Sequence, residues 1–167
     1  MKKLFFTVLV LCFAASTGFA QRRGIVGLAS MDIGVSMNGF KEFRPLDFTL
    51  TLGYGFNDRW FAAVPFTASN ILLSPSGARN YMPDLRIGAQ VGYNFIADER
   101  NTVAVTGTFS GTVYADPYKA LCYDLGVMWT PTGHWRAMVR GGFRYYQSLG
   151  SGYRDYANIY IGFGFRF

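Results

Sequence analysis

The chain has 167 residues, half of them apolar and 18% aromatic, and it carries a formal net charge of +6. The length predicts one domain, and because the basic residues do not cluster in runs, we expect no nucleic-acid partner. Beyond residue 20 no apolar run is long enough for a membrane-spanning helix. Strands that cross a membrane by alternation are not excluded, since their signal is a period of two rather than a solid apolar block.

Residues 1–20 have the pattern of a cleaved secretory signal peptide. Two lysines precede an apolar segment, residues 4–15, and small residues stand three and one positions before Gln21. The apolar segment is too short to span a bilayer as a helix. We therefore predict an exported domain over residues 21–167. Because Cys122 is its single cysteine, no internal disulfide is expected.

Apolar residues alternate with polar or small residues in eight segments of the exported domain. A period of two indicates a β-strand with one apolar face, and about 9–11 residues suffice for a tilted strand to cross the hydrocarbon of a bilayer. Asp32, turned inward, sets the phase of the least regular segment, and Pro65 predicts irregular pairing in the third. The predicted strands are residues 25–36, 46–56, 60–68, 85–95, 102–113, 121–129, 135–145 and 157–167.

The connections between these segments predict two different ends for a barrel. Residues 57–59, 97–101 and 130–134 are short turns, and they fall at the same end as both chain termini. Three of the four opposite connections are longer, whereas the fourth, residues 115–119, is short. The longer connections are residues 37–45, 70–83 and 147–155. An even number of antiparallel strands with short turns at one end and longer loops at the other is typical of membrane barrels.

Aromatic residues at the strand ends predict a belt at each end. Trp60, Trp129 and Trp135 fall at the short-turn end, where we expect them to form an interfacial girdle. Six tyrosines are expected toward the other end, namely Tyr81, Tyr114, Tyr118, Tyr145, Tyr146 and Tyr153.

Eight charged residues fall on the inward faces of the predicted strands. They are Asp32, Asp47, Arg86, Asp124, Arg136, Arg140, Arg144 and Arg166. Eight strands leave an interior only wide enough for side chains to fill, so charges there must pair. If Trp129 faces Trp135 across the turn, the same register sets Asp124 opposite Arg140. We interpret this set as a structural ion-pair network. Five arginines against three aspartates leave open an anion-attracting lumen instead.

Catalytic and metal-binding chemistry is not favoured by the residues present. His134 is the single histidine, and it falls in a predicted short turn without an acidic neighbour in sequence. One cysteine, Cys122, and one histidine cannot make a zinc site. We therefore expect neither an enzyme nor a cofactor.

The leader, the eight alternating strands, the tryptophan rim and the terminal Phe167 resemble the small outer-membrane β-barrels of the OmpA transmembrane-domain and OmpX type. The resemblance implies an all-β, eight-stranded antiparallel up-and-down transmembrane barrel in the outer membrane of a Gram-negative bacterium. It also implies periplasmic N- and C-termini and insertion by the outer-membrane assembly machinery. The residues expected to carry the insertion signal are Tyr160, Phe163, Phe165 and Phe167.

Three functions are compatible with this resemblance. We expect a monomer with a structural, surface-interaction or adhesion role, in contact with outer-membrane lipids that include lipopolysaccharide. A narrow, porin-like channel or a conduit for hydrophobic ligands is the alternative. A lipid A-modifying enzyme is disfavoured, because His134 lies at the end opposite the outer leaflet. Arg79, Lys119 and Arg154 fall near the outer rim, where lipid A phosphates would lie.

Overall fold

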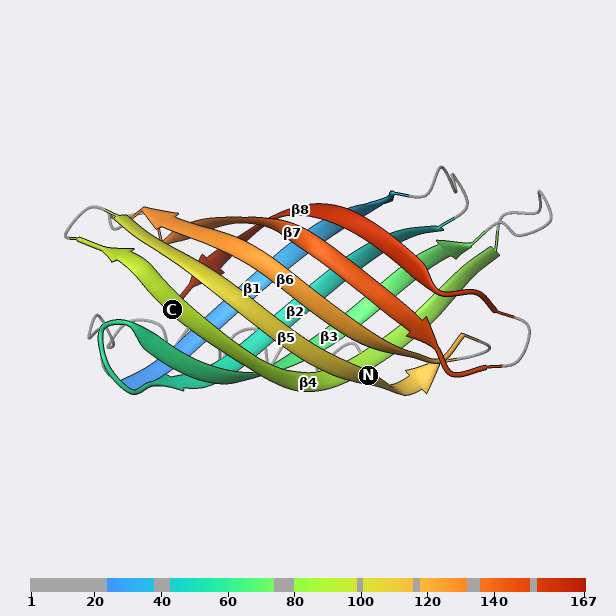
Figure 1. Cartoon of the computed structure of the whole chain (residues 1–167), viewed down its shortest axis with the longest axis horizontal. Helices are drawn as coiled ribbons and strands as arrows, with labels where there is room; N and C mark the ends of the chain where they lie inside the picture. The colour runs from blue at the N-terminus through green and yellow to red at the C-terminus, as the bar shows by residue number, and fades with distance from the viewer. Residues whose placement is uncertain are drawn as a thin grey trace, which may run out of the picture.

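The computed structural model describes residues 24–37, 43–73, 80–98, 101–115, 118–131, 136–150 and 153–167. These residues form a closed antiparallel barrel of eight strands in which each strand pairs with its neighbours in chain order and β8 pairs with β1 (Figure 1). The strands are β1 (Gly24–Ser36), β2 (Phe43–Gly55), β3 (Trp60–Leu73), β4 (Asn80–Ala97), β5 (Asn101–Ala115), β6 (Ala120–Pro131), β7 (Ala137–Ser148) and β8 (Tyr156–Arg166). The predicted all-β, eight-stranded up-and-down fold is confirmed. The predicted signal peptide, residues 1–20, lies outside the described residues.

The two ends of the barrel, seen at the left and right of Figure 1, carry different connections. At the turn end, which also holds both ends of the barrel chain, the strands are joined by residues 56–59, 98–100 and 132–136. At the loop end they are joined by residues 37–42, 74–79, 116–119 and 149–155. All three long loops predicted from the sequence are therefore shorter than expected.

The β3–β4 hairpin explains the largest of these differences. The residues around its tip lack strict alternation, but they still pair, from Asn70 with Pro83 to Leu73 with Asn80. In a closed barrel each strand has a partner on both sides, so backbone pairing continues where the side-chain pattern stops.

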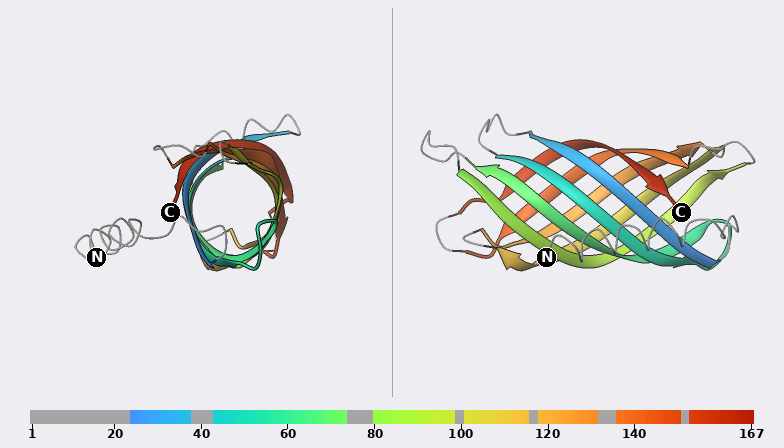
Figure 2. Two further views of the ribbon diagram at one scale, coloured as in Figure 1. Left: turned by 90° about the vertical axis from the view of Figure 1, so that its left-hand side faces the viewer. Right: turned by 180° about the vertical axis from the view of Figure 1, so that it is seen from behind.

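Side-chain burial alternates along the strands as the sequence predicts. On β1, Asp32 is fully buried whereas the adjacent Ile33 is 53% exposed, which confirms the inward phase of Asp32. Large apolar side chains such as Phe48, Leu125 and Phe163 are exposed on the outer surface. Figure 2 shows the strands as a tilted ring around one lumen. Within the described part of the chain, no helix is long and apolar enough to span a bilayer.

Pro65 interrupts the ladder between β3 and β4 as predicted. Pairing runs to Ala63 with Gln90 and resumes at Phe66 with Ile87, while the pairing of β3 with β2 continues through Pro65. Proline has no N–H to donate, so one side of the strand loses its partner at this position.

The barrel closes where the end of the chain meets β1. The backbone N and O of Phe167 bond to the O and N of Gly27 at 2.9 and 3.0 Å. A Cβ at Gly27 would lie 2.3 Å from the Phe167 ring, so the ring packs over a position that has no side chain. The terminal residue therefore completes the closing seam.

Candidate functional site

The lumen is filled in three layers along the barrel axis. The order follows from β6, which carries Met128 toward the turn end, Asp124 in the middle and Cys122 toward the loop end. The turn-end cluster consists of Val26, Leu28, Phe61, Ala63, Ala104, Met128 and Met138. The loop-end cluster consists of Ile71, Met82, Tyr118, Ala120, Cys122, Tyr146 and Tyr156. Between them lies the charged layer, which consists of Asp32, Asp47, Asp84, Arg86, Asp124, Arg140 and Arg144.

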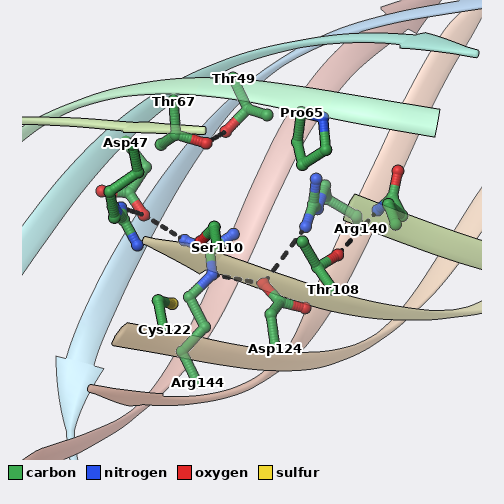
Figure 3. A pocket seen from close by; sticks show the side chains of 12 residues that line it. Asp47, Thr49, Pro65, Thr67, Thr108, Ser110, Cys122, Asp124, Arg140 and Arg144 are labelled. Carbon is green, nitrogen blue, oxygen red and sulfur yellow. Dashed lines mark hydrogen bonds and ion pairs between the residues drawn. The ribbon is translucent and has the colours of Figure 1, made fainter. Parts of the chain in front are cut away.

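Arg144 on β7 is the centre of the charged layer. Its Nε contacts Asp124 Oδ2 at 2.5 Å (Figure 3). Its Nη2 contacts Asp32 Oδ2, also at 2.5 Å. Its Nη1 donates to Asp47 Oδ2. The guanidinium carbon also lies 3.8 Å from the centre of the Tyr160 ring. One side chain thereby links β7 to β1, β2, β6 and β8, which are separated by much of the sequence.

Arg86 on β4 extends the layer to the other side of the barrel. Its Nη2 contacts Asp47 Oδ2 at 2.9 Å, and its Nε lies 2.8 Å from Asp84 Oδ2. Ser69 Oγ accepts a hydrogen bond from Arg86 and donates one to Asp47 Oδ1, each at 2.5 Å. Asp47 is therefore shared between two arginines, Arg86 and Arg144.

Arg140 completes the layer on the side toward the turn end. Its Nη2 donates to Tyr160 Oη at 3.0 Å and lies 3.5 Å from Asp124 Oδ2, and its Nε lies 3.6 Å from Asp32 Oδ1. Tyr160 Oη in turn donates to Asp124 Oδ1 at 2.9 Å. Because a buried charge without a partner is costly, these shared contacts are what permits seven charged residues to occupy one lumen.

The charge balance of this layer differs from the prediction. Asp84 belongs to it, and Arg136 and Arg166 do not, because Arg136 is exposed before β7 and Arg166 is partly exposed at the end of β8. Four buried aspartates therefore face three buried arginines, a formal balance of one negative charge. The ion-pair network is the main expectation and is present, whereas the alternative of a basic, anion-attracting lumen does not fit the charge balance of this layer.

Asp84 was missed because the sequence interpretation began the fourth strand at Leu85. Asp84 and Arg86 stand two residues apart and so face the same side of a strand. That spacing is a usable signal, but the fourth strand, predicted to follow a loop over residues 70–83, begins one residue too late to include Asp84.

The register of β6 and β7 also corrects an expectation. Asp124 is paired with Arg144, not Arg140, and Trp129 is paired with Val139. The predicted turn at residues 130–134 was too tight, since β6 continues to Pro131 and β7 begins at Ala137. Arg140 still reaches Asp124 because its long side chain spans the diagonal between neighbouring strands.

The aromatic residues predicted at the two ends of the barrel differ in their exposure. Trp60 and Trp129 are exposed at the turn end, and Trp129 Nε1 donates to Asn101 Oδ1 at 3.1 Å. Trp135 lies outside the described residues, as do His134 and Arg79.

At the loop end, Tyr81 and Tyr114 are exposed, but Tyr118 and Tyr146 are buried in the loop-end cluster, so their assignment to an outer belt was wrong. Tyr146 shares the inward phase of Arg144, two residues before it on the strand. Burial raises the pKa of Tyr118 above its ordinary value.

The residues expected to carry the insertion signal point in two directions. Phe163 and Phe165 are exposed on the outer surface, whereas Tyr160 is buried among the ion pairs. Their role in assembly remains a prediction.

One small cavity adjoins the charged layer. It has a volume of about 20 Å³ and is lined by polar groups that include Thr49, Gln90 and Thr108, with the ring of Pro65. A cavity of this size holds roughly one water molecule. Among the described residues, no group of three or more His, Cys, Asp or Glu side chains is arranged to hold a metal ion. Cys122 is a buried free thiol.

No protein-family model and no curated protein match the chain. Among solved structures, the barrel is similar to the crystal structure of Neisserial surface protein A (NspA), with a TM-score of 0.51 and 14% sequence identity over 88% of this chain and 98% of that one. It also matches the backbone structure of the Yersinia pestis outer membrane protein Ail in a phospholipid bilayer nanodisc, with a TM-score of 0.43 and 18% identity over 84% of this chain and 99% of that one. The match to NspA concerns the fold. In fold, the chain is a small eight-stranded barrel of the outer-membrane type.

Proposed function

We propose that the protein is an integral, monomeric outer-membrane barrel with a structural, surface-interaction or adhesion role. The observation that carries this proposal is the combination of an apolar outer face and a lumen closed by ion pairs. Exposed Phe, Leu, Ile and Val side chains surround the barrel on every strand, which is unfavourable in water and favourable in lipid. The periplasmic placement of the turn end belongs to the same proposal.

The filled lumen supports a role other than conduction. An apolar cluster lies on each side of the charged layer, and the cavity beside that layer has room for about one water molecule. A path for solutes would need side chains from all three layers to move. The narrow channel therefore ranks second, and the small polar cavity is the observation in its favour.

What remains available for function is the loop end. Lys119 and Arg154 are exposed there, beside connections that would face the outside of the cell. Their charge fits contact with lipopolysaccharide phosphates, and the name of NspA describes a surface protein, which agrees with a role at the cell surface. We propose no catalytic role.

Two measurements test this function. Purified protein should show heat-modifiable migration on gels and insert into liposomes, and planar bilayers containing it should show no steady conductance. A protein that stays monomeric in water without detergent would overturn membrane residence, and stable ion conductance would favour the channel. Binding of intact cells to host-cell matrix, compared between a deletion strain and its complemented parent, tests the adhesion role.

A further inference from the structure

The turn between β2 and β3 presents one arginine at the turn end of the barrel. Asn94 on β4 fixes the backbone of this turn, because its N donates to Arg59 O at 2.7 Å and its Nδ2 donates to Asp58 O at 2.9 Å. Asn57 Oδ1 accepts from the backbone N of Arg59 at 2.8 Å. The backbone that carries Arg59 is therefore held in place by a neighbouring strand and by its own turn.

The side chain of Arg59 is held as well. Its Nη1 donates to Tyr93 Oη at 3.2 Å. Tyr93 is the cross-strand partner of Trp60, and the centres of their rings are 4.7 Å apart. Trp60 is 47% exposed on the outer face. A guanidinium group is thus anchored beside two outward aromatic rings at the edge of the apolar surface.

Most of the hydrogen-bonding capacity of Arg59 is still available. The hydroxyl of Tyr93 uses one of the five N–H donors of the guanidinium. Within the described residues, Arg59 takes part in no ion pair. An exposed, fixed guanidinium with free donors matches the oxygens of a phosphate group, to which arginine binds in a bidentate manner.

The outer face next to this corner is apolar. On the outward side, the pair that follows Trp60 and Tyr93 toward the middle of the barrel is Ala62 with Val91. Ala62 and the nearby outward Ala89 carry small side chains, whereas Tyr54 projects from the adjacent strand. Together with the exposed Val64 and Val91, these residues make the outer face below the two rings apolar.

We propose that Arg59, Trp60 and Tyr93 form a binding site for the headgroup phosphate of a glycerophospholipid whose acyl chain lies over Ala62. The proposal rests on the membrane residence proposed above. Tryptophan and tyrosine favour the level of the lipid headgroups, and a basic side chain near a membrane surface is attracted to anionic lipid. Arg59 lies beside Trp60 and Tyr93 and therefore at the level expected for the lipid headgroups.

Native mass spectrometry of the delipidated, full-length barrel in detergent tests the site. The probes are phosphatidylglycerol and diacylglycerol with the same acyl chains, and purified lipid A serves as a third probe. Arg59→Gln should lower the affinity for the tightest bound phosphatidylglycerol about fivefold. Tyr93→Phe should lower it about twofold, because the guanidinium loses its anchor. Arg44→Gln, at an exposed arginine of β2 near the loop end, is the matched control and should leave the affinity unchanged.

Four outcomes would overturn the site. They are equal affinity of wild type and Arg59→Gln, an equal loss in Arg59→Gln and Arg44→Gln, an Arg59-dependent affinity for diacylglycerol, and an Arg59-dependent preference for lipid A over phosphatidylglycerol. Heat-modifiable migration of each variant shows that it is folded. Failure of membrane residence is distinguished because the wild type would then neither insert into liposomes nor retain any lipid.

Discussion

The charged layer and the two apolar clusters fill the same lumen by different physical means. The charged layer consists of interlocked contacts in which Arg144 alone touches three aspartates from three strands. The apolar clusters consist of many weak contacts, each of which is worth little by itself. The comparison teaches that the charged layer depends on the members that several partners share, such as Arg144 and Asp47, whereas the clusters tolerate small changes in shape.

The largest effect is expected from removing the centre of the charged layer. Arg144→Met should leave Asp32, Asp47 and Asp124 without their shared cation and destabilise the barrel by about 3–5 kcal/mol. Equilibrium urea unfolding in lipid vesicles measures the change. A loss below about 1 kcal/mol would show that the layer does not depend on this arginine.

The second test compares two aspartates within the charged layer. Asp47→Asn removes a carboxylate shared by two arginines and should cost about 3 kcal/mol. Asp84→Asn removes the surplus negative charge of the layer and keeps a polar group beside Arg86, so its cost should be about 1 kcal/mol or less. The same unfolding assay applies to both variants. Equal costs would contradict the charge balance derived from the buried residues.

The third test shortens an apolar side chain, and its loss of stability is compared with the losses expected in the charged layer. Ile71 is fully buried in the loop-end cluster, and Ile71→Val removes one methylene group from it. We expect a loss of about 1 kcal/mol, since neighbouring side chains relax only partly into the space. If this variant were as unstable as Arg144→Met, the distinction between the layer and the clusters would fail.

The smallest effect is expected at the exposed edge of the loop end. Tyr145 Oη donates to Asp155 Oδ2 at 2.6 Å and Ser148 N donates to Asp155 Oδ1 at 2.8 Å, and both bonds lower the pKa of Asp155 below its ordinary value of 3.8. The stability that they contribute is present above the unfolded pKa and is lost as the pH falls through the folded pKa. Tyr145→Phe should raise the pKa of Asp155 toward 3.8, as measured by NMR titration. An unchanged pKa would exclude the tyrosine as its main cause.

The fold was predictable because alternation is a local property. The outward and inward faces of β2 and β6 follow from their residues in order, and the inward phase of Asp47 and Asp124 follows with them. Backbone pairing beyond the alternating segments was not predictable in this way, as the extension of β3 to Leu73 shows. That pairing depends on the neighbouring strand and not on the sequence of the segment itself.

The sequence by itself determined the number of strands, their order and which face of each alternating segment turns inward, because a period of two depends only on adjacent residues and on an apolar surrounding. Only the tertiary structure decided that Arg144 stands opposite Asp124, that Asp84 joins the charged layer and that Tyr146 is buried. These facts depend on register, which a change in turn length shifts without altering the alternation. The stagger of the strands therefore decides which charged residues pair inside a barrel, whereas the alternation within each strand decides which of its faces turns inward.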